Sequence, residues 1–200
     1  MKIVLIVVAA LILVFGCASK KPDQQEIKQP RTSITESSRT QVKTSTYQEL
    51  TRQLQREIKS GQVQIKQFEE GIKITMANDI LFPEGGWKIH RGGKETLDKF
   101  IVALKGRKNL AVEVYGFTDN TPIGPMLRRQ FSTNRELSLA RAVDVVTYME
   151  GKGINRDIIS ATGYGDERPI APNDSAAGRR KNQRVELVIF FSELQLSMRE

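Results

Sequence analysis

Between residues 63 and 191, segments in which apolar residues occupy every second position alternate with segments in which they recur at helical spacing. This alternation limits the folds open to the chain. Apolar and polar residues alternate on both sides of a turn at Glu69 to Gly71, as in a half-buried hairpin. Three further strand-like segments read NLAVEVYG, IISATGYG and VELVIFF. The helical segments KETLDKFIVALKG and TNRELSLARAVDVVTYMEGKG lie between them. This order predicts an α/β sandwich with helices packed on one face of a sheet and at least one right-handed crossover.

Both helical segments have recognisable ends and a predicted core face. The first segment stops at Gly106 and the second closes on Gly151, as helices commonly do at their C-termini. Thr133 and Glu136 stand in the capping-box relation at the start of the second helix. The apolar side chains at helical spacing are Leu97, Phe100, Ile101 and Leu104 in the first helix, and Leu139, Ala142, Val143, Val146 and Met149 in the second.

The N-terminus resembles an export signal. Lys2 is followed by uncharged, mostly apolar residues up to Phe15, a stretch shorter than the ~20 residues that span a bilayer. The segment VFGCAS then resembles the lipobox of bacterial lipoproteins, whose cysteine, here Cys17, is acylated and becomes the mature N-terminus. A cleaved signal with an incidental cysteine, or an uncleaved anchor, is the alternative. Ala18 resembles the outer-membrane form of the sorting signal, which predicts a lipid-anchored protein of the outer membrane with its domain in the periplasm.

The predicted organisation has five parts. Residues 1–16 form the signal peptide, and residues 17–45 form a lipidated N-terminus and flexible tether because they contain too few large apolar side chains to offset ordering. Residues 46–62 form a short amphipathic helix capped at Gly61, for which another envelope protein is a candidate partner. Residues 63–192 form the folded domain, and residues 193–200 form a tail.

Composition excludes several kinds of site. One cysteine and one histidine, His90, cannot assemble a zinc cluster, and no cofactor is expected. Neither a nucleophile elbow nor a Walker sequence is present, so the chain offers no recognisable catalyst. The net charge of +8 favours an anionic partner, but the basic run GRRKNQR at residues 178–184 lacks interleaved aromatic residues, and nucleic acid is a poor partner for an exported protein. This run is expected to be a solvated loop.

Two charged residues are candidates for ligand binding. Asp119 lies in a loop just past a predicted strand, where ligand-holding side chains concentrate, although an Asx-turn beside Asn120 is the alternative. Arg141 lies about opposite the predicted core face of its helix and is expected to project outward. A surface pair with Asp144, one turn along, is the alternative for Arg141.

Four segments in order resemble one family. VYGFTDNTPIG, STNRELSLARAVDVVTYMEGKGI, ISATGYGDERPIAPN and GRRKNQRVELVI are similar in order and spacing to the C-terminal OmpA-like peptidoglycan-binding domain shared by OmpA, the lipoprotein Pal and the flagellar stator protein MotB. The resemblance covers about Val63 to Phe191. It implies a βαβαβ-type mixed sheet and a non-enzymatic role in binding the cell wall.

The resemblance also implies the site. In this family an aspartate and an arginine, here Asp119 and Arg141, hold the diaminopimelate residue of the peptidoglycan stem peptide. Diaminopimelate is zwitterionic at its side-chain end, so an anion suits its ammonium and a planar guanidinium suits its carboxylate. Asn134 and loop amides are implied for the remaining carboxylate and peptide groups. The other positions implied to contact peptidoglycan are Phe117, Thr118, Asn120, Leu137 and Arg184.

This chain departs from the family pattern in places. The segment TPIGPMLRRQFST lengthens the loop between Asp119 and Arg141, as in MotB-like members, and Gln183 stands where an arginine is frequent. The leading function is a lipoprotein that anchors the outer membrane to peptidoglycan. A MotB-like stator subunit, a secretion-system accessory and, less favoured, an envelope hydrolase are the alternatives.

Overall fold

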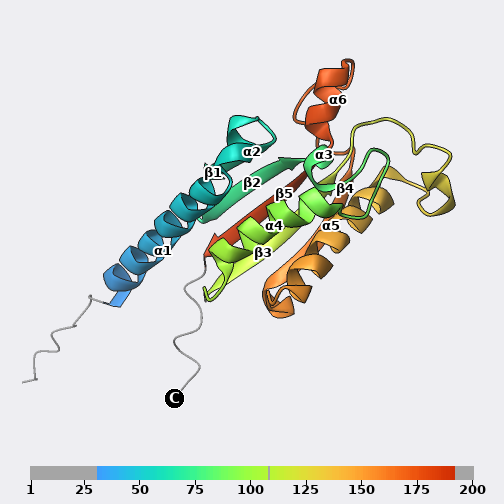
Figure 1. Cartoon of the computed structure of the whole chain (residues 1–200). Helices are drawn as coiled ribbons and strands as arrows, with labels where there is room; N and C mark the ends of the chain where they lie inside the picture. Colours follow the sequence, from blue (N-terminus) through green and yellow to red (C-terminus); the bar gives the residue numbers. More distant parts are fainter. Residues whose placement is uncertain (1–30, 108, 192–200) are drawn as a thin grey trace, which may run out of the picture.

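The computed structural model describes residues 31–107 and 109–191, and its sheet has five strands in the order β1-β2-β5-β3-β4. β1 and β2 form the predicted hairpin, and β5 lies between β2 and β3, antiparallel to both. β3 and β4 are parallel and are joined through α5, which confirms the predicted α/β fold (Figure 1). The strands are β1 (Val63–Gln67), β2 (Gly71–Ala77), β3 (Leu110–Phe117), β4 (Ile159–Gly165) and β5 (Arg184–Phe191).

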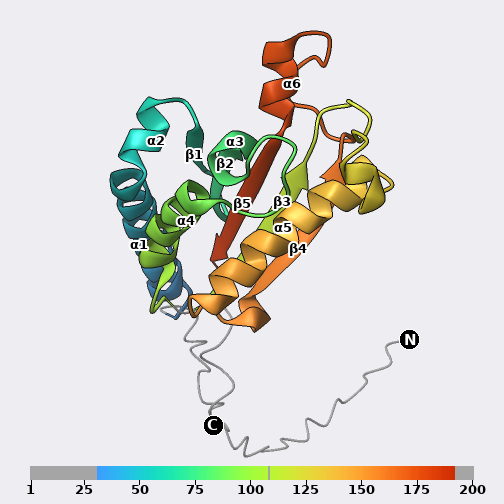
Figure 2. The same ribbon diagram turned by 45° about the vertical axis from the view of Figure 1, so that its right-hand side comes forward.

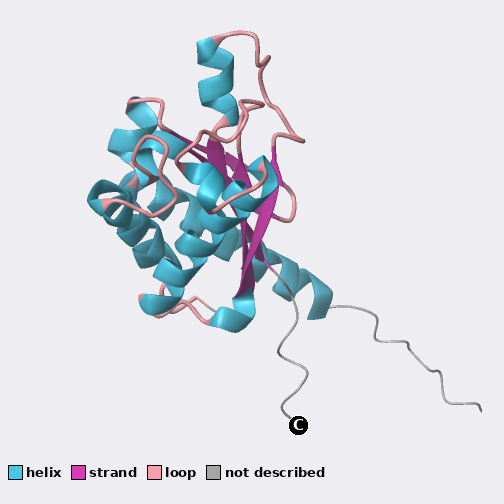
Figure 3. Cartoon of the chain, turned by 90° about the vertical axis from the view of Figure 1, so that its right-hand side faces the viewer, coloured by secondary structure: helices cyan, strands magenta, loops and turns pink. Residues whose placement is uncertain are grey.

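The core lies between the sheet and the helices that cover one of its faces. α4 and α5 lie across the sheet, and α1 packs beside α4 (Figure 2). Most of the helical ribbon lies on one side of the strands when the molecule is turned further (Figure 3). The helices are α1 (Arg31–Gln53), α2 (Gln55–Lys59), α3 (Asn78–Leu81), α4 (Arg91–Leu104), α5 (Asn134–Gly151) and α6 (Ala176–Asn182), with short 3₁₀ turns at Leu127–Arg129 and Arg156–Ile158.

The predicted core face of α4 is confirmed. Leu97, Phe100, Ile101 and Leu104 are all buried in the hydrophobic core. His90 caps the N-terminus of α4, because its Nδ1 accepts a hydrogen bond from the backbone N–H of Gly93 at 3.1 Å. The loop that precedes α4 is thereby fixed at its C-terminal end.

The predicted core face of α5 is wrong in part. Leu139 and Val143 are exposed, whereas the buried face consists of Leu137, Ser138, Arg141, Ala142, Val145 and Met149. The cause lies in the strands below. Gly116 and Gly163 are partners in the β3–β4 pair. A Cβ on Gly116 would stand 2.1 Å from the carbonyl oxygen of Ser138, and a Cβ on Gly163 would stand 2.4 Å from the backbone nitrogen of Leu139. The helix backbone fills the space that these glycines leave, and this close approach turns Ser138 toward the sheet.

The N-terminal helix is longer than the sequence predicted. α1 begins at Arg31, so the expected tether up to residue 45 is helical over residues 31–45. Leu50 and Leu54 pack in the core, and once that packed turn has formed each added helical residue gains one hydrogen bond without the cost of a new nucleus. The predicted cap at Gly61 is confirmed, because Gly61 has a positive φ and the N–H groups of Gly61 and Gln62 return to Ile58 and Glu57 in a Schellman motif.

Several predictions concern residues outside those that the structure describes. They are the signal peptide at residues 1–16, lipidation of Cys17, the tether over residues 17–30 and the tail at residues 193–200. Among the helices of residues 31–107 and 109–191, none combines the length and the apolar character that a membrane span requires.

Candidate ligand-binding pocket

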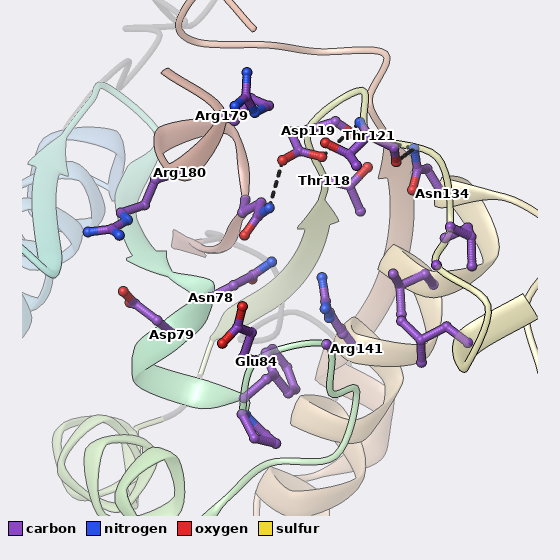
Figure 4. A pocket seen from close by; sticks show the side chains of 18 of the residues that line it. Asn78, Asp79, Glu84, Thr118, Asp119, Thr121, Asn134, Arg141, Arg179 and Arg180 are labelled. Atoms are coloured by element: carbon purple, nitrogen blue, oxygen red, sulfur yellow. Dashed lines mark hydrogen bonds between the residues drawn. The ribbon is translucent and has the colours of Figure 1, made fainter. Parts of the chain in front are cut away.

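A cavity of about 730 Å³ lies at the end of the sheet where β3 ends. The loop after β3 forms one wall, α3 and the loop after it form a second, and the N-terminal half of α5 and the helix α6 complete it. Of the residues implied by the family resemblance, five line the cavity: Thr118, Asp119, Asn134, Leu137 and Arg141 (Figure 4).

Asp119 is buried and both of its carboxylate oxygens are hydrogen-bonded. Oδ1 accepts from the backbone N–H of Thr121 at 2.9 Å, so the Asx-turn expected as an alternative role does form. Oδ2 accepts from Nε2 of Gln183 at 2.6 Å (Figure 4). Asp119 is only 5% exposed, and both donors are uncharged. The turn and the ligand role are therefore compatible, because the turn holds the carboxylate on the cavity wall.

Arg141 is buried, which corrects the expectation that it projects outward. Its side chain is 8% exposed and points into the cavity (Figure 4). Nε and Nη2 donate to the carbonyl oxygen of Gly86 at 3.0 and 2.7 Å. Asp144, the alternative partner considered for Arg141, instead accepts from Nζ of Lys88 at 2.6 Å and from the N–H of Ile89 at 2.8 Å. The turn of α5 toward the sheet carries Arg141 inward with its buried face.

Burial lowers the pKa of Arg141 to about 10, and the nearby charge of Asp119 partly offsets this effect. A cation with that pKa is still protonated at neutral pH. No ion pair joins Arg141 to Asp119 among the residues that the structure describes, although the two side chains line the same cavity. Of the charged residues that line the cavity, Asp119 and Arg141 are the buried ones in the described part of the chain, and they do not neutralise each other by direct contact.

Two buried polar atoms on the cavity wall have no hydrogen-bond partner within the described ranges. They are Oδ1 of Asn78 and Oγ1 of Thr118. Nδ2 of Asn78 faces the carbonyl oxygen of Phe117 at 3.5 Å, which directs its oxygen away from that carbonyl. An unpaired buried polar atom is destabilising by about 1 to 3 kcal/mol, and native proteins contain only a few of them.

Asn134 holds the loop after β3 in place. Its Nδ2 donates to the carbonyl oxygens of Asp119 at 3.3 Å and Thr121 at 3.1 Å. Thr133 caps α5 as predicted, accepting from the N–H of Glu136 at 3.2 Å, while Glu136 reaches back to the N–H of Ser132. The start of α5 is therefore joined to the loop that carries Asp119.

Phe117, Asn120 and Arg184 are not among the residues that line the cavity, and the contact with peptidoglycan implied for them stays a prediction. The guanidinium carbon of Arg184 lies 3.7 Å from the ring centroid of Phe117, and its Nε donates a hydrogen bond to Oε1 of Glu186 at 2.8 Å. Strand alternation places Arg184 and Glu186 on the face of β5 opposite Val185, away from the helices. Phe117 and Arg184 thus pack against each other, and Asn120 is exposed.

The basic run at residues 178–184 is not the expected solvated loop. Most of it belongs to α6, whose N-terminal Ser175 accepts from the N–H of Gly178 at 3.1 Å. Arg179, Arg180 and Gln183 line the cavity. Ser175, as a typical N-cap residue, was the sequence signal that could have indicated this helix. The helix was missed because its seven residues show no apolar periodicity. Across the two described ranges, no three histidine, cysteine, aspartate or glutamate side chains converge as metal ligands.

Three curated relatives resemble parts of this chain. Motility protein B of Bacillus subtilis is 32% identical over 131 residues, which are 64% of this chain and 48% of that protein. "Probable lipoprotein YiaD" of Escherichia coli is 29% identical over 64% of this chain and 55% of its own length. Peptidoglycan-binding protein ArfA of Mycobacterium tuberculosis is 31% identical over 60% of this chain and 35% of its own length. The chain therefore spans about half or less of the length of these relatives.

Two solved structures have the same fold. A MotB-like protein from Desulfovibrio vulgaris superposes with a TM-score of 0.69 and 26% identity, over 80% of this chain and 98% of that one. The cell wall anchor of the type VI secretion system of Pseudomonas aeruginosa superposes with a TM-score of 0.65 and 30% identity, over 72% of this chain and 97% of that one. The OmpA family matches residues 81–183, which are just over half of the sequence. This range includes every residue that lines the cavity except those at the start of α3. The chain belongs to the OmpA family.

Proposed function

We propose that this protein binds peptidoglycan without cleaving it, and that the cavity holds the diaminopimelate residue of the stem peptide. Support comes from the family and from two similar proteins whose names refer to the wall, the peptidoglycan-binding protein ArfA and the type VI cell wall anchor. The cavity adds a chemical reason. It holds a buried anion and a buried cation on separate walls, which matches a ligand that carries both charges at one end.

The observation that carries the proposal is that Asp119 and Arg141 are both buried but not paired with each other. A buried charge without a charged partner is unfavourable, so such a pair is retained where a ligand completes it. Asp119 would accept the distal ammonium of diaminopimelate. Arg141 still has N–H groups besides those that bond to Gly86, and these would donate to the carboxylate. Asn134 contributes by fixing the Asp119 loop, and Thr118 and Leu137 line the cavity.

The lipid anchor is a further part of the proposal. The VFGCAS segment supports acylation of Cys17, and similarity to "Probable lipoprotein YiaD" agrees with it. In this proposal the lipid holds the N-terminus in the outer membrane and the domain holds the wall. A stator subunit or a secretion-system accessory is the second candidate, favoured by the MotB and type VI relatives. Fatty-acid labelling of the full chain separates the lipoprotein from these candidates.

Calorimetric titration of the full chain tests the ligand. Wild type, Asp119→Ala, Arg141→Ala and the double variant are titrated with a stem peptide that contains diaminopimelate, and with the same peptide containing lysine. Lysine keeps the ammonium and lacks the distal carboxylate. Each single change should weaken diaminopimelate binding by about 2 to 4 kcal/mol, and the double variant should bind scarcely more weakly than either single one. Equal wild-type affinity for the two peptides would contradict the proposal.

Incubation with purified cell wall separates binding from hydrolysis. A binder should sediment with the wall and release nothing, whereas a hydrolase should release soluble fragments. Release of fragments by wild type, and none by Asp119→Ala, would replace this proposal with a catalytic one.

A further inference from the structure

Asn78 lies on the cavity wall beside Asp119. It is the first residue after β2, and β5 separates the end of β2 from the end of β3, which Asp119 follows. The backbone N–H of Asn78 donates to the carbonyl oxygen of Gln183 at 3.0 Å, and Nε2 of Gln183 donates to Oδ2 of Asp119 at 2.6 Å. A single residue therefore connects Asn78 to the proposed ammonium acceptor, and both side chains line the cavity (Figure 4).

The side chain of Asn78 is buried but poorly satisfied. It is 6% exposed, and its Oδ1 has no hydrogen-bond partner in the described part of the chain. Its Nδ2 donates to the carbonyl oxygen of Phe117 at 3.5 Å, which is longer than a usual N–H···O bond. In the unliganded protein this amide therefore gains little from its surroundings.

The amide can turn its oxygen toward the cavity without losing a strong contact. The χ2 torsion of asparagine is broad, so a partial rotation gives up only the 3.5 Å contact with Phe117. A side-chain carbonyl oxygen accepts hydrogen bonds and cannot donate them, so it recognises an N–H group. The Thr118 hydroxyl, which also has no partner within the two described ranges, can do both and is less selective. At the end of the ligand that Asp119 receives, the N–H donor is the ammonium.

We infer that Asn78 is a further binding residue for the ligand ammonium, and that its Oδ1 accepts one N–H group while Asp119 accepts another. This inference rests on the proposed function, in which Asp119 receives that ammonium. An ammonium has three N–H donors, and one carboxylate does not use them all. Asn78 lies outside the family match at residues 81–183, so the resemblance to the OmpA family assigns it no role. It adds to the affinity that Asp119 and Arg141 supply and does not replace them.

The test compares two stem peptides that differ only in the distal amine. One contains diaminopimelate, and the other contains 2-aminopimelate, which keeps the distal carboxylate. The full chain is titrated calorimetrically as wild type, as Asn78→Leu, which is close in shape and has no acceptor, and as Asn78→Asp, which keeps an acceptor oxygen. Asp79→Asn is the matched control, because Asp79 is the next residue, lines the cavity and is exposed.

Wild type should prefer the diaminopimelate peptide by about thirtyfold or more, as the loss of a buried charge partner implies. Asn78→Leu should reduce that preference by about five- to tenfold, and its affinity for the 2-aminopimelate peptide should equal that of wild type. Asn78→Asp should retain the preference, and Asp79→Asn should change it by less than about twofold. Asn78→Leu should unfold at the wild-type temperature or above it, because an unpaired buried polar atom is removed.

An equal loss for both peptides in Asn78→Leu, or a marked fall in its unfolding temperature, would show that Asn78 only supports the cavity wall, and would overturn the inference. An unchanged preference in Asn78→Leu, or a loss in Asn78→Asp as large as in Asn78→Leu, would overturn it as well. These outcomes leave the role of Asp119 intact. If wild type itself shows no preference between the two peptides, the proposed ammonium site of Asp119 fails, and the role of Asn78 fails with it.

Discussion

Arg141 donates two hydrogen bonds to the single carbonyl oxygen of Gly86, a residue 55 positions earlier in the chain. One turn further along α5, Asp144 accepts from Lys88 and from the N–H of Ile89. Two side chains of one helix therefore hold the loop between α3 and α4. The residue proposed to bind the ligand carboxylate is also part of the structure of the unliganded protein.

Arg141→Ala should accordingly lower the free energy of unfolding by about 2 kcal/mol, because the Gly86 carbonyl loses two charge-assisted hydrogen bonds while the desolvation of the guanidinium is relieved. This is more than a surface arginine would contribute. Urea denaturation followed by circular dichroism measures it. Arg141→Lys keeps the charge and one possible bond, so its loss should be smaller. A change below about 0.5 kcal/mol in Arg141→Ala would show that the loop is held by other contacts.

Gly116→Ala and Gly163→Ala should each destabilise the fold by about 3 kcal/mol, since the added methyl group would overlap the backbone of α5. Ligand binding should fall as well, because α5 carries Arg141. Gly151→Ala is the matched control: nothing lies within 4 Å of its Cβ, and the change should be neutral or stabilising by up to about 1 kcal/mol. Thermal and chemical unfolding of the three variants test this, and similar stability for all of them would argue against the close approach.

Arg180→Ala should weaken wall binding about two- to threefold, because Arg180 lines the cavity on an exposed helix where its charge is largely screened. Lys181→Ala removes the same charge one residue away, from a side chain that does not line the cavity, and should have no measurable effect. Sedimentation with purified wall should persist above ~0.3 M salt, where screening reaches less than ~10 Å. Equal losses for the two variants, or no binding at that salt, would indicate attraction by overall charge.

Binding through Arg141 should have a defined pH dependence. The cationic form donates to the carboxylate, so this contribution is fully present below the pKa of Arg141, about 10, and is lost as pH rises through that value. An N-acetylated peptide with 2-aminopimelate has no amine, and its affinity should be constant from about pH 6 to about pH 8.5 and then fall. Titration with a circular dichroism check for unfolding measures this. A decline centred near neutral pH would assign the effect to another group.

Cys17→Ser should abolish fatty-acid labelling and release the protein from the outer-membrane fraction, because the proposed anchor is the lipid. Wall binding by the purified variant should be unchanged, since Cys17 lies outside the family match at residues 81–183. Metabolic labelling and membrane fractionation give the two measurements. Absence of label in wild type would remove the lipoprotein assignment and leave the wall-binding proposal untouched.

Apolar periodicity was sufficient for the strands and for α4, because most of their buried side chains are apolar. It failed for α5, where Gly116 and Gly163 lie in strands far from Ser138 in sequence and decide which face turns inward. It also failed at the start of α1, where helix continues through polar residues. In both places the decisive contact is tertiary, and a local pattern does not contain it.

The same limit applies to the cavity. Family motifs led to Asp119 and Arg141, which the structure brings to one cavity, but the motifs also included Phe117 and Arg184, which pack against each other outside it. Gln183 stood out only as a departure from the family pattern. Its bond to Asp119 joins residues 64 positions apart and becomes visible only once α6 is placed.

The central position of β5 has a consequence for how the protein is made. β5 joins the β1–β2 hairpin to the β3–β4 pair, and it comes after both in the sequence. A nascent chain that has emerged only as far as α6 holds two separate halves of a sheet with no strand between them. Closure of the five-stranded sheet must therefore wait until synthesis reaches Phe191, and the two halves remain unjoined until then.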